Sequence, residues 1–256
     1  MPQMTRRNII MAERSAEIKR FTSETEIRLN FCIDGQGDFD LETGIPFFDH
    51  MLNGFTRHGL FDLSSKIRGD IEVDYHHTIE DTGIVLGEAI REAIGDKRGI
   101  RRFGQAILPM DEALVLCAID LSGRPYYSSD LTFTCEKIGD MDTEMVREFF
   151  YAISYSAGMN LHFKQLSGVN NHHIAECAFK AFAKALDMAT SLDERITGVL
   201  STKEVCKRER KSVEYERIQC EEFARTYFYE KWKSRDRTDK FSDSWKTFHS
   251  GTGKIL

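Results

Sequence analysis

The sequence predicts an α+β fold of two similar halves, each a small mixed or antiparallel sheet with helices packed on one face. A His-His-x-x-Glu motif begins at His76 and again 96 positions later at His172. Both motifs open long segments whose apolar residues recur at helical spacing. A strand precedes each of them, at residues 27–33 and 114–119, where apolar residues occupy the expected positions. We interpret these matches as an internal duplication.

In the first half, the period-two alternation of residues 27–33 indicates a half-buried strand. The turn signal Asp34-Gly35 then predicts a hairpin, and Gly35-Gln-Gly37 is a turn rather than a phosphate loop because it lacks a third glycine. The other predicted elements are a strand at 38–43, a short helix at 47–57, a strand pair across 62–73 and a long helix at 76–94 that Gly95 ends.

In the second half, the nearly continuous apolar run at residues 113–121 predicts a central strand, with residues 131–135 as a candidate neighbour. A helix that Asp142 caps should run to about residue 157, and another should begin near His172. The predicted organisation is an N-terminal extension (1–18), a domain with halves at about 19–107 and 108–203, and a charged, partly helical C-terminal extension (204–256).

Composition excludes several classes of protein. The chain has 256 residues, a net charge of −6 and no basic stripe in its first 200 residues, so we expect no nucleic acid partner. No apolar run approaches the roughly 20 residues of a membrane helix, and residues 1–17 lack the apolar region of a secretory signal. Cys32, Cys117 and Cys177 lie in apolar segments, which suits core thiols in a cytoplasmic protein.

The repeated motif predicts metal binding. In a helix, Glu80 shares a side with the histidines three and four positions before it, whereas adjacent His76 and His77 lie about 100° apart. Each motif should therefore offer one histidine to each of two ions. Imidazole with carboxylate suits Mn²⁺, Fe²⁺, Zn²⁺ or Co²⁺. His50 and His162 complete a set of three histidines and one glutamate for each ion, which leaves out His58 and His249.

Basic residues near turns indicate an anion site, since Arg forks and Ser hydroxyls suit phosphate oxygens. The candidates are Arg101, Arg102, Arg124, Lys180, Ser201 and Lys203. Glu24, Asp111 and Glu112 are acid–base candidates, and the residues alone do not rank these three carboxylates.

Several segments, in this order, resemble the imidazoleglycerol-phosphate dehydratase family of histidine biosynthesis. They include Gly44-Ile-Pro-Phe-Phe-Asp-His, both histidine motifs, Pro109-Met-Asp-Glu-Ala, Asp120-Leu-Ser-Gly-Arg and Ser201-Thr-Lys. The resemblance spans about residues 19–203. It departs after Lys203, where Glu204 stands in place of the family's glycine and a long tail follows.

The resemblance implies two similar α/β halves, two Mn²⁺ ions in each active site and loss of water from a phosphorylated imidazole substrate. It also implies a cytoplasmic homo-oligomer of 24 subunits, built from trimers, whose sites are shared between subunits. Carried over by motif, the metal ligands are His50, His76, His77, Glu80, His162, His172, His173 and Glu176. The phosphate contacts are Arg102, Arg124, Lys180, Ser201 and Lys203. Glu24 takes the acid–base role, with Glu176 and His77 as further catalytic residues.

Two other functions use the same ligands. One is a metal-binding structural or storage assembly, in which the phosphate contacts Arg102, Arg124 and Lys203 would have no function. A dinuclear hydrolase would use a metal-bound hydroxide and would turn over simple phosphate esters.

Overall fold

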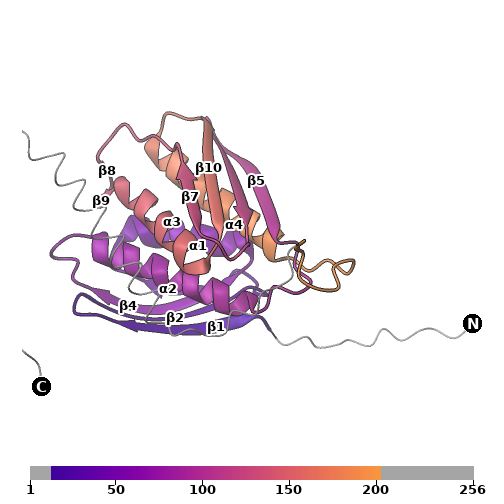
Figure 1. Cartoon of the computed structure of the whole chain (residues 1–256). Coiled ribbons are helices and arrows are strands. Elements are labelled where there is room, and N and C mark those ends of the chain that lie inside the picture. Colours follow the sequence, from indigo (N-terminus) through magenta and orange to yellow (C-terminus); the bar gives the residue numbers. More distant parts are fainter. Residues whose placement is uncertain (1–12, 203–256) are drawn as a thin grey trace, which may run out of the picture. The chain divides into compact units, whose positions relative to one another are not determined.

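The computed structural model describes residues 13–202, which form two four-stranded sheets with four helices between them (Figure 1). The first half contains β1 (Ser15–Phe21), β2 (Thr25–Cys32), β3 (Phe39–Glu42), α1 (Pro46–Gly59), β4 (Asp62–Gly69) and α2 (His76–Ile94). The second contains β5 (Phe103–Met110), β6 (Ala113–Asp120), β7 (Tyr126–Ser129), α3 (Glu144–Ala157), β10 (Asn160–Ser167) and α4 (Asn171–Thr190). A small hairpin, β8 (Lys137–Ile138) and β9 (Met141–Asp142), lies between β7 and α3.

The two sheets have the same topology, which confirms the duplicated α+β fold. Their strand orders are β1-β2-β4-β3 and β5-β6-β10-β7. In each sheet the third strand of the half pairs in parallel with the strand after the first helix, as β3 does with β4 and β7 with β10. The other neighbouring pairs are antiparallel. The β8–β9 hairpin has no counterpart in the first half.

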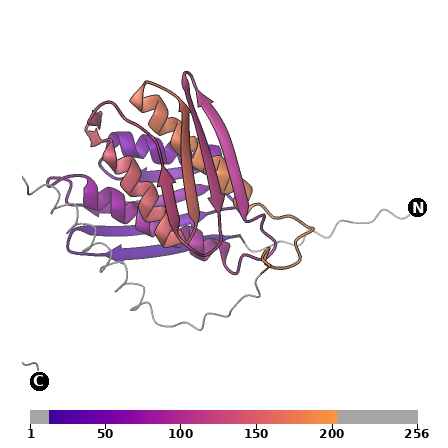
Figure 2. The ribbon, with the colours of Figure 1, turned by 45° about the horizontal axis from the view of Figure 1, so that its top comes forward.

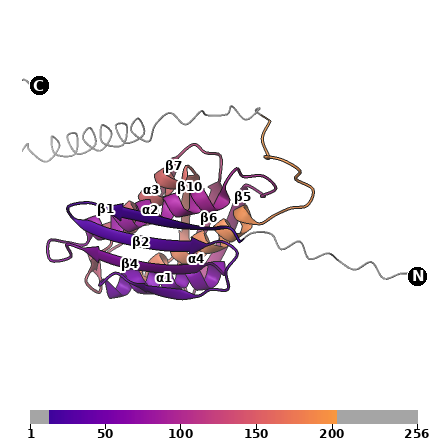
Figure 3. The same ribbon diagram turned by 90° about the horizontal axis from the view of Figure 1, so that it is seen from below.

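The helices lie between the two sheets (Figures 2 and 3). Their buried apolar side chains hold the halves together. Helix α2 packs against α3, and α1 packs against α4, so each contact joins the two halves. Phe48 of α1 meets Phe149 of α3 edge to face at 5.0 Å, and Phe55 of α1 stacks on Phe182 of α4 at 5.4 Å. These four rings are almost completely buried. The halves therefore share one hydrophobic core.

The alternation in β2 is as predicted, because Ile27, Leu29 and Phe31 are buried and the residues between them are exposed. Three other predictions of strands were wrong. The chain after Asp34 does not return along β2 as a hairpin, since β3 crosses to pair with β4. Residues 62–73 form one strand, β4, followed by a turn, and residues 131–135 form no strand.

Six strands lie where none was predicted, namely β1, β5, β7, β8, β9 and β10. Strand β1 pairs with β2 along its whole length, and it begins at Ser15, inside the expected N-terminal extension. Strand β5 approaches α4 closely at Gly104, where a Cβ atom would overlap the carbonyl oxygen of Ala185. The alternation of β5 is obscured because small Gly104 and Ala106 face inward while apolar Phe103 and Ile107 are exposed. Strand β10 carries His162. The helical tail predicted after Lys203 lies outside the described residues.

Among the helices of residues 13–202, none combines the length and the apolar character needed to cross a membrane. Cys32, Cys117 and Cys177 are free and buried, as predicted for core thiols.

Close packing of α2 on α3 depends on two glycines one turn apart. A Cβ atom at Gly87 would lie 2.8 Å from the Cβ of Ser156 and 2.9 Å from the carbonyl oxygen of Ile153. At Gly83 it would lie 2.8 Å from the carbonyl oxygen of Phe149. By contrast, nothing lies within 4 Å of the same position at Gly54 in α1.

We predict that Gly87→Ala destabilises the protein by up to about 2 kcal/mol. Overpacking costs about 1–3 kcal/mol and outweighs the roughly 1 kcal/mol that alanine gains in a helix. Gly54→Ala is the matched control, and it should stabilise the protein by about 0.5–1 kcal/mol. Urea unfolding measures both values. Equal stabilisation by the two substitutions would contradict the packing argument.

Candidate metal centre and active site

One cluster of candidate ligands joins the two halves. His50 on α1 lies beside His172 and Glu176 on α4, and one ligand atom from each lies within 4.8 Å of the other two. The Oε2 atom of Glu176 is 3.1 Å from Nε2 of His172 and 3.7 Å from Nε2 of His50. Two imidazole nitrogens and a carboxylate oxygen suit a divalent transition metal ion.

A second cluster lies on α2. Nε2 of His76 is 3.5 Å from Oε2 of Glu80, the i, i+4 arrangement that His172 and Glu176 repeat on α4. The Glu80 carboxylate raises the pKa of His76, and the same hydrogen bond lowers the pKa of Glu80. The duplicated motif therefore places an imidazole and a carboxylate together in each half.

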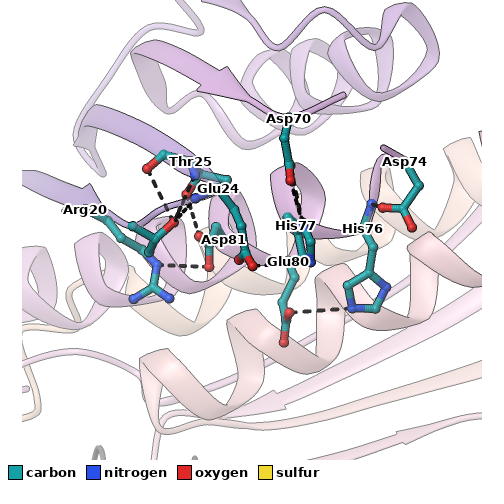
Figure 4. A network of polar contacts seen from close by, with 10 residues as sticks. Arg20, Glu24, Thr25, Asp70, Asp74, His76, His77, Glu80 and Asp81 are labelled. Atoms are coloured by element: carbon teal, nitrogen blue, oxygen red, sulfur yellow. Dashed lines mark hydrogen bonds and ion pairs between the residues drawn. The ribbon is translucent and has the colours of Figure 1, made fainter. Parts of the chain in front are cut away.

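The second histidine of each motif faces a different way. The rings of His76 and His77 are inclined at 85°, and those of His172 and His173 at 84°. His77 turns towards Asp70 (Figure 4). The adjacent histidines of each motif thus diverge as their helical spacing requires.

Both of these second histidines are held by a carboxylate through Nδ1. Nδ1 of His77 is 3.0 Å from Asp70, and Nδ1 of His173 is 2.7 Å from Glu112. Such a hydrogen bond orients an imidazole and leaves Nε2 for an ion, as the outer carboxylates of metal sites do. No role was predicted for Asp70, which lies within the strand pair predicted across residues 62–73.

The three acid–base candidates have different surroundings in the structure. Glu112 accepts hydrogen bonds from His173 and from the backbone N–H groups of Val169 and Asn170. These bonds, led by that from His173, lower the pKa of Glu112 to about 2, which makes it a poor proton acceptor. Asp111 is 78% exposed. Glu24 lies in the β1–β2 turn with Oε1 3.9 Å from Nε2 of His77.

Arg102 is engaged with protein partners. Its Nε and Nη2 atoms donate to the two carboxylate oxygens of Asp120 at 2.7 and 3.1 Å, and its Nη1 atom donates to the carbonyl oxygen of Leu200 at 2.7 Å. Arg102 has a φ angle of 67°, in the left-handed region. The Asp120 carboxylate thus aims Arg102 at the segment that carries Ser201. Two of the five N–H groups of the guanidinium remain for another acceptor.

His162 is apart from the other candidate ligands. Its neighbours Leu161 and Phe163 are buried against the helices, so His162 points to the opposite face of the sheet, where its ring lies 5.4 Å from that of Tyr126. Helix α4 begins beyond the other end of β10, roughly 16 Å further along the strand. Arg124 follows β6 at the same end of the sheet as His162.

Lys180 lies on α4, one turn after Glu176, and its Nζ atom is 2.7 Å from Oε1 of that residue. Lys203 lies outside the described residues. Within residues 13–202 of one chain, the candidate ligands and phosphate contacts therefore do not meet at one place.

Comparisons with known proteins show the family of the chain. The sequence model of the imidazoleglycerol-phosphate dehydratase family matches residues 43–186. The imidazoleglycerol-phosphate dehydratase of Lachnoclostridium phytofermentans is 64% identical over 190 residues, which are 74% of this chain and 97% of that protein. That of Acetivibrio thermocellus is 58% identical, over 75% of this chain and 98% of the relative.

Solved structures show the same fold. The crystal structure of the imidazoleglycerol-phosphate dehydratase of Staphylococcus aureus superposes with a TM-score of 0.64 at 37% identity, over 70% of this chain and 99% of that one. The structure of IGPD from Pyrococcus furiosus gives a TM-score of 0.62 at 36% identity, over 72% and 100%. The family match and these relatives define a hydro-lyase. The chain belongs to the imidazoleglycerol-phosphate dehydratase family.

The pair of Arg102 and Asp120 generates a prediction. Asp120→Asn should destabilise the chain by about 1–2 kcal/mol, because both side chains are only 19% exposed. This value lies between the roughly 0–1 kcal/mol of an exposed ion pair and the 3–5 kcal/mol of breaking a buried one. The rate of amide hydrogen exchange should also rise in residues 191–202, because Arg102 donates a hydrogen bond to the carbonyl oxygen of Leu200.

Glu26→Gln is the matched control for this substitution. Glu26 pairs with Arg28 over 3.4 Å and both side chains are more than half exposed, so its loss should change stability by less than about 0.5 kcal/mol. If the free energy of unfolding of Asp120→Asn is as high as that of Glu26→Gln, the contact with Arg102 does not stabilise the chain.

Proposed function

We propose that this chain catalyses the manganese-dependent loss of water from D-erythro-imidazole-glycerol phosphate to give imidazole-acetol phosphate, in cytoplasmic histidine biosynthesis. Membership of the dehydratase family supports the substrate and the reaction. The single observation that carries the proposal is the paired arrangement of His50, His172 and Glu176 and of His76 with Glu80. These clusters offer nitrogen and oxygen donors only, which suits Mn²⁺.

The residues that would hold two Mn²⁺ ions are His50, His76, His77, Glu80, His162, His172, His173 and Glu176. When bound, such cations favour the imidazolate form of the substrate ring, because a nearby cation lowers the pKa of the group that it binds. Loss of the hydroxyl beside an electron-rich ring is easier than its loss beside a neutral one.

Glu24 is the group that we place at the proton transfer. Dehydration removes the hydroxyl next to the ring and the hydrogen on the following carbon, and the resulting enol becomes the ketone. The carboxylate of Glu24 takes the carbon-bound proton, since Glu112 is held by three hydrogen bonds. Arg102, Arg124, Lys180, Ser201 and Lys203 bind the phosphate and so fix the orientation of the substrate.

We also propose that the active sites form between subunits, in an assembly of 24 chains built from trimers. The position of His162 supports this, because it lies on the outer face of its sheet and far from the N-terminus of α4. A ligand on that face can join the helical ligands only if another copy supplies them. The phosphate candidates Arg102 and Arg124 lie at the same end of the sheet as His162.

The activity prediction is tested with full-length protein and imidazole-glycerol phosphate. Addition of Mn²⁺ to chelator-treated protein should restore formation of imidazole-acetol phosphate. Hydrolysis of p-nitrophenyl phosphate should stay at background, whereas a dinuclear hydrolase would turn it over. Metal-loaded, fully assembled protein that forms no ketone would overturn the proposed reaction.

Mixing two inactive variants tests whether sites are shared. His162→Ala and His76→Ala should each abolish turnover, and assemblies refolded from an equal mixture should regain part of it, because some sites then receive both histidines from different chains. As a control, the two variants are mixed after each has assembled separately. That mixture should stay inactive, because its sites contain chains of one variant only. If co-assembled mixtures of the correct size regain no turnover, each site is built within one chain.

A further inference from the structure

We propose that buried Asp81 acts through Thr25 as a positioning residue for Glu24. This inference rests on the proposed function, in which Glu24 takes a proton from the substrate. It concerns the turn between β1 and β2, which carries Glu24 beside His77 (Figure 4). Asp81 is not among the ligands or substrate contacts described above.

The backbone of Glu24 is held from both sides. The hydroxyl of Thr22 accepts hydrogen bonds from the N–H groups of Glu24 and Thr25, at 3.1 and 2.9 Å. The carbonyl oxygen of Glu24 accepts from the N–H group of Asp70 at 3.1 Å. The same Asp70 holds His77, so the turn and that imidazole share one support. The Glu24 side chain itself extends from this fixed frame.

Asp81 attaches that frame to helix α2. Its side chain is 9% exposed, and its Oδ2 atom accepts a hydrogen bond from the hydroxyl of Thr25. Its Oδ1 atom forms an ion pair with Nε of Arg20 at 2.9 Å, on the strand before the turn. A buried carboxylate is tolerated only where hydrogen bonds and an opposite charge compensate its lost hydration. Asp81 therefore ties the strands on both sides of the turn to the helix.

With this attachment, α2 both carries candidate metal ligands and holds the turn of Glu24. The helix carries the candidate ligands His77 and Glu80, and the residue after Glu80 anchors the turn of Glu24. A single rigid element therefore sets the position of the ions and of the proton acceptor together. A shift of about 1 Å in such a group can lower a rate about a hundredfold.

The second half shows that the anchor is particular to the first. Cys177 follows Glu176 where Asp81 follows Glu80, and its thiol donates to the carbonyl oxygen of Leu108. There the corresponding turn is held by its own carboxylate, Glu112, which binds backbone N–H groups and His173. In the first half Thr22, Asp70 and Asp81 hold the turn. Within residues 13–202, no such bond occupies the side chain of Glu24 as His173 and the backbone occupy that of Glu112.

Two substitutions at Thr25 test the anchor in the assembled, Mn²⁺-loaded enzyme. Thr25→Val removes the hydroxyl and should lower kcat about 10- to 100-fold, with KM changed less than about threefold and metal content unchanged. Thr25→Ser keeps the donor and should restore kcat to within about threefold of the parent enzyme. Thr190→Val is the matched control, because that buried hydroxyl bonds only carbonyl oxygens of its own helix, and kcat should stay unchanged.

A double-mutant cycle with Glu24→Gln separates positioning from simple support. Glu24→Gln should leave a slow, measurable rate, since acid–base groups contribute about 10²–10⁴-fold. If Thr25 acts through Glu24, Thr25→Val should then lower kcat by less than about twofold in that background. Equal losses in both backgrounds, unchanged kcat in Thr25→Val, or loss of metal would overturn the inference. An inactive parent enzyme would instead overturn the proposed function.

Discussion

Two histidines that are adjacent in a helix point about 100° apart, and the candidate site depends on this constraint. In each motif the first histidine stays beside the glutamate one turn later, as His76 does with Glu80. The second turns to a carboxylate, as His77 does to Asp70. Each motif therefore presents its two imidazoles in two directions. His162 lies on the outer face of its sheet, away from both helical motifs, and this position is what supports the proposal of shared sites.

The duplication provides two equivalent frames, and the chain uses their turns differently. In the second half the turn carboxylate Glu112 is bound to His173 and to backbone N–H groups, which lowers its pKa to about 2. In the first half the buried Asp81 holds the turn, and Glu24 faces His77. The two halves thus differ in how they use the carboxylate of the turn. Glu112 is occupied by structural hydrogen bonds, and Glu24 is the one that we propose for proton transfer. Symmetry of fold does not entail symmetry of function.

The fold class was predictable because the signals that carry it are local. Alternation in β2 and helical periodicity in α2 and α4 depend on neighbouring residues alone, and each was found in the structure. Strand β5 was missed because Phe103 and Ile107 are apolar but exposed, whereas Gly104 faces inward against the backbone of α4. The parallel pairing of β3 with β4 was missed because the turn at Asp34 gives no sign of a crossover. Pairing between distant segments leaves no local pattern.

The sequence by itself determined that histidine and glutamate share a helix face, because helical geometry sets i, i+4 neighbours whatever surrounds them. It also determined the duplication and the family. Only the tertiary structure decided that His50 joins His172 and Glu176, since packing of α1 on α4 creates that proximity. It likewise decided that Arg102 is paired with Asp120 and that Asp81 holds the turn of Glu24. These contacts join residues far apart in the chain, and their partners are chosen by the packing of helices between two sheets.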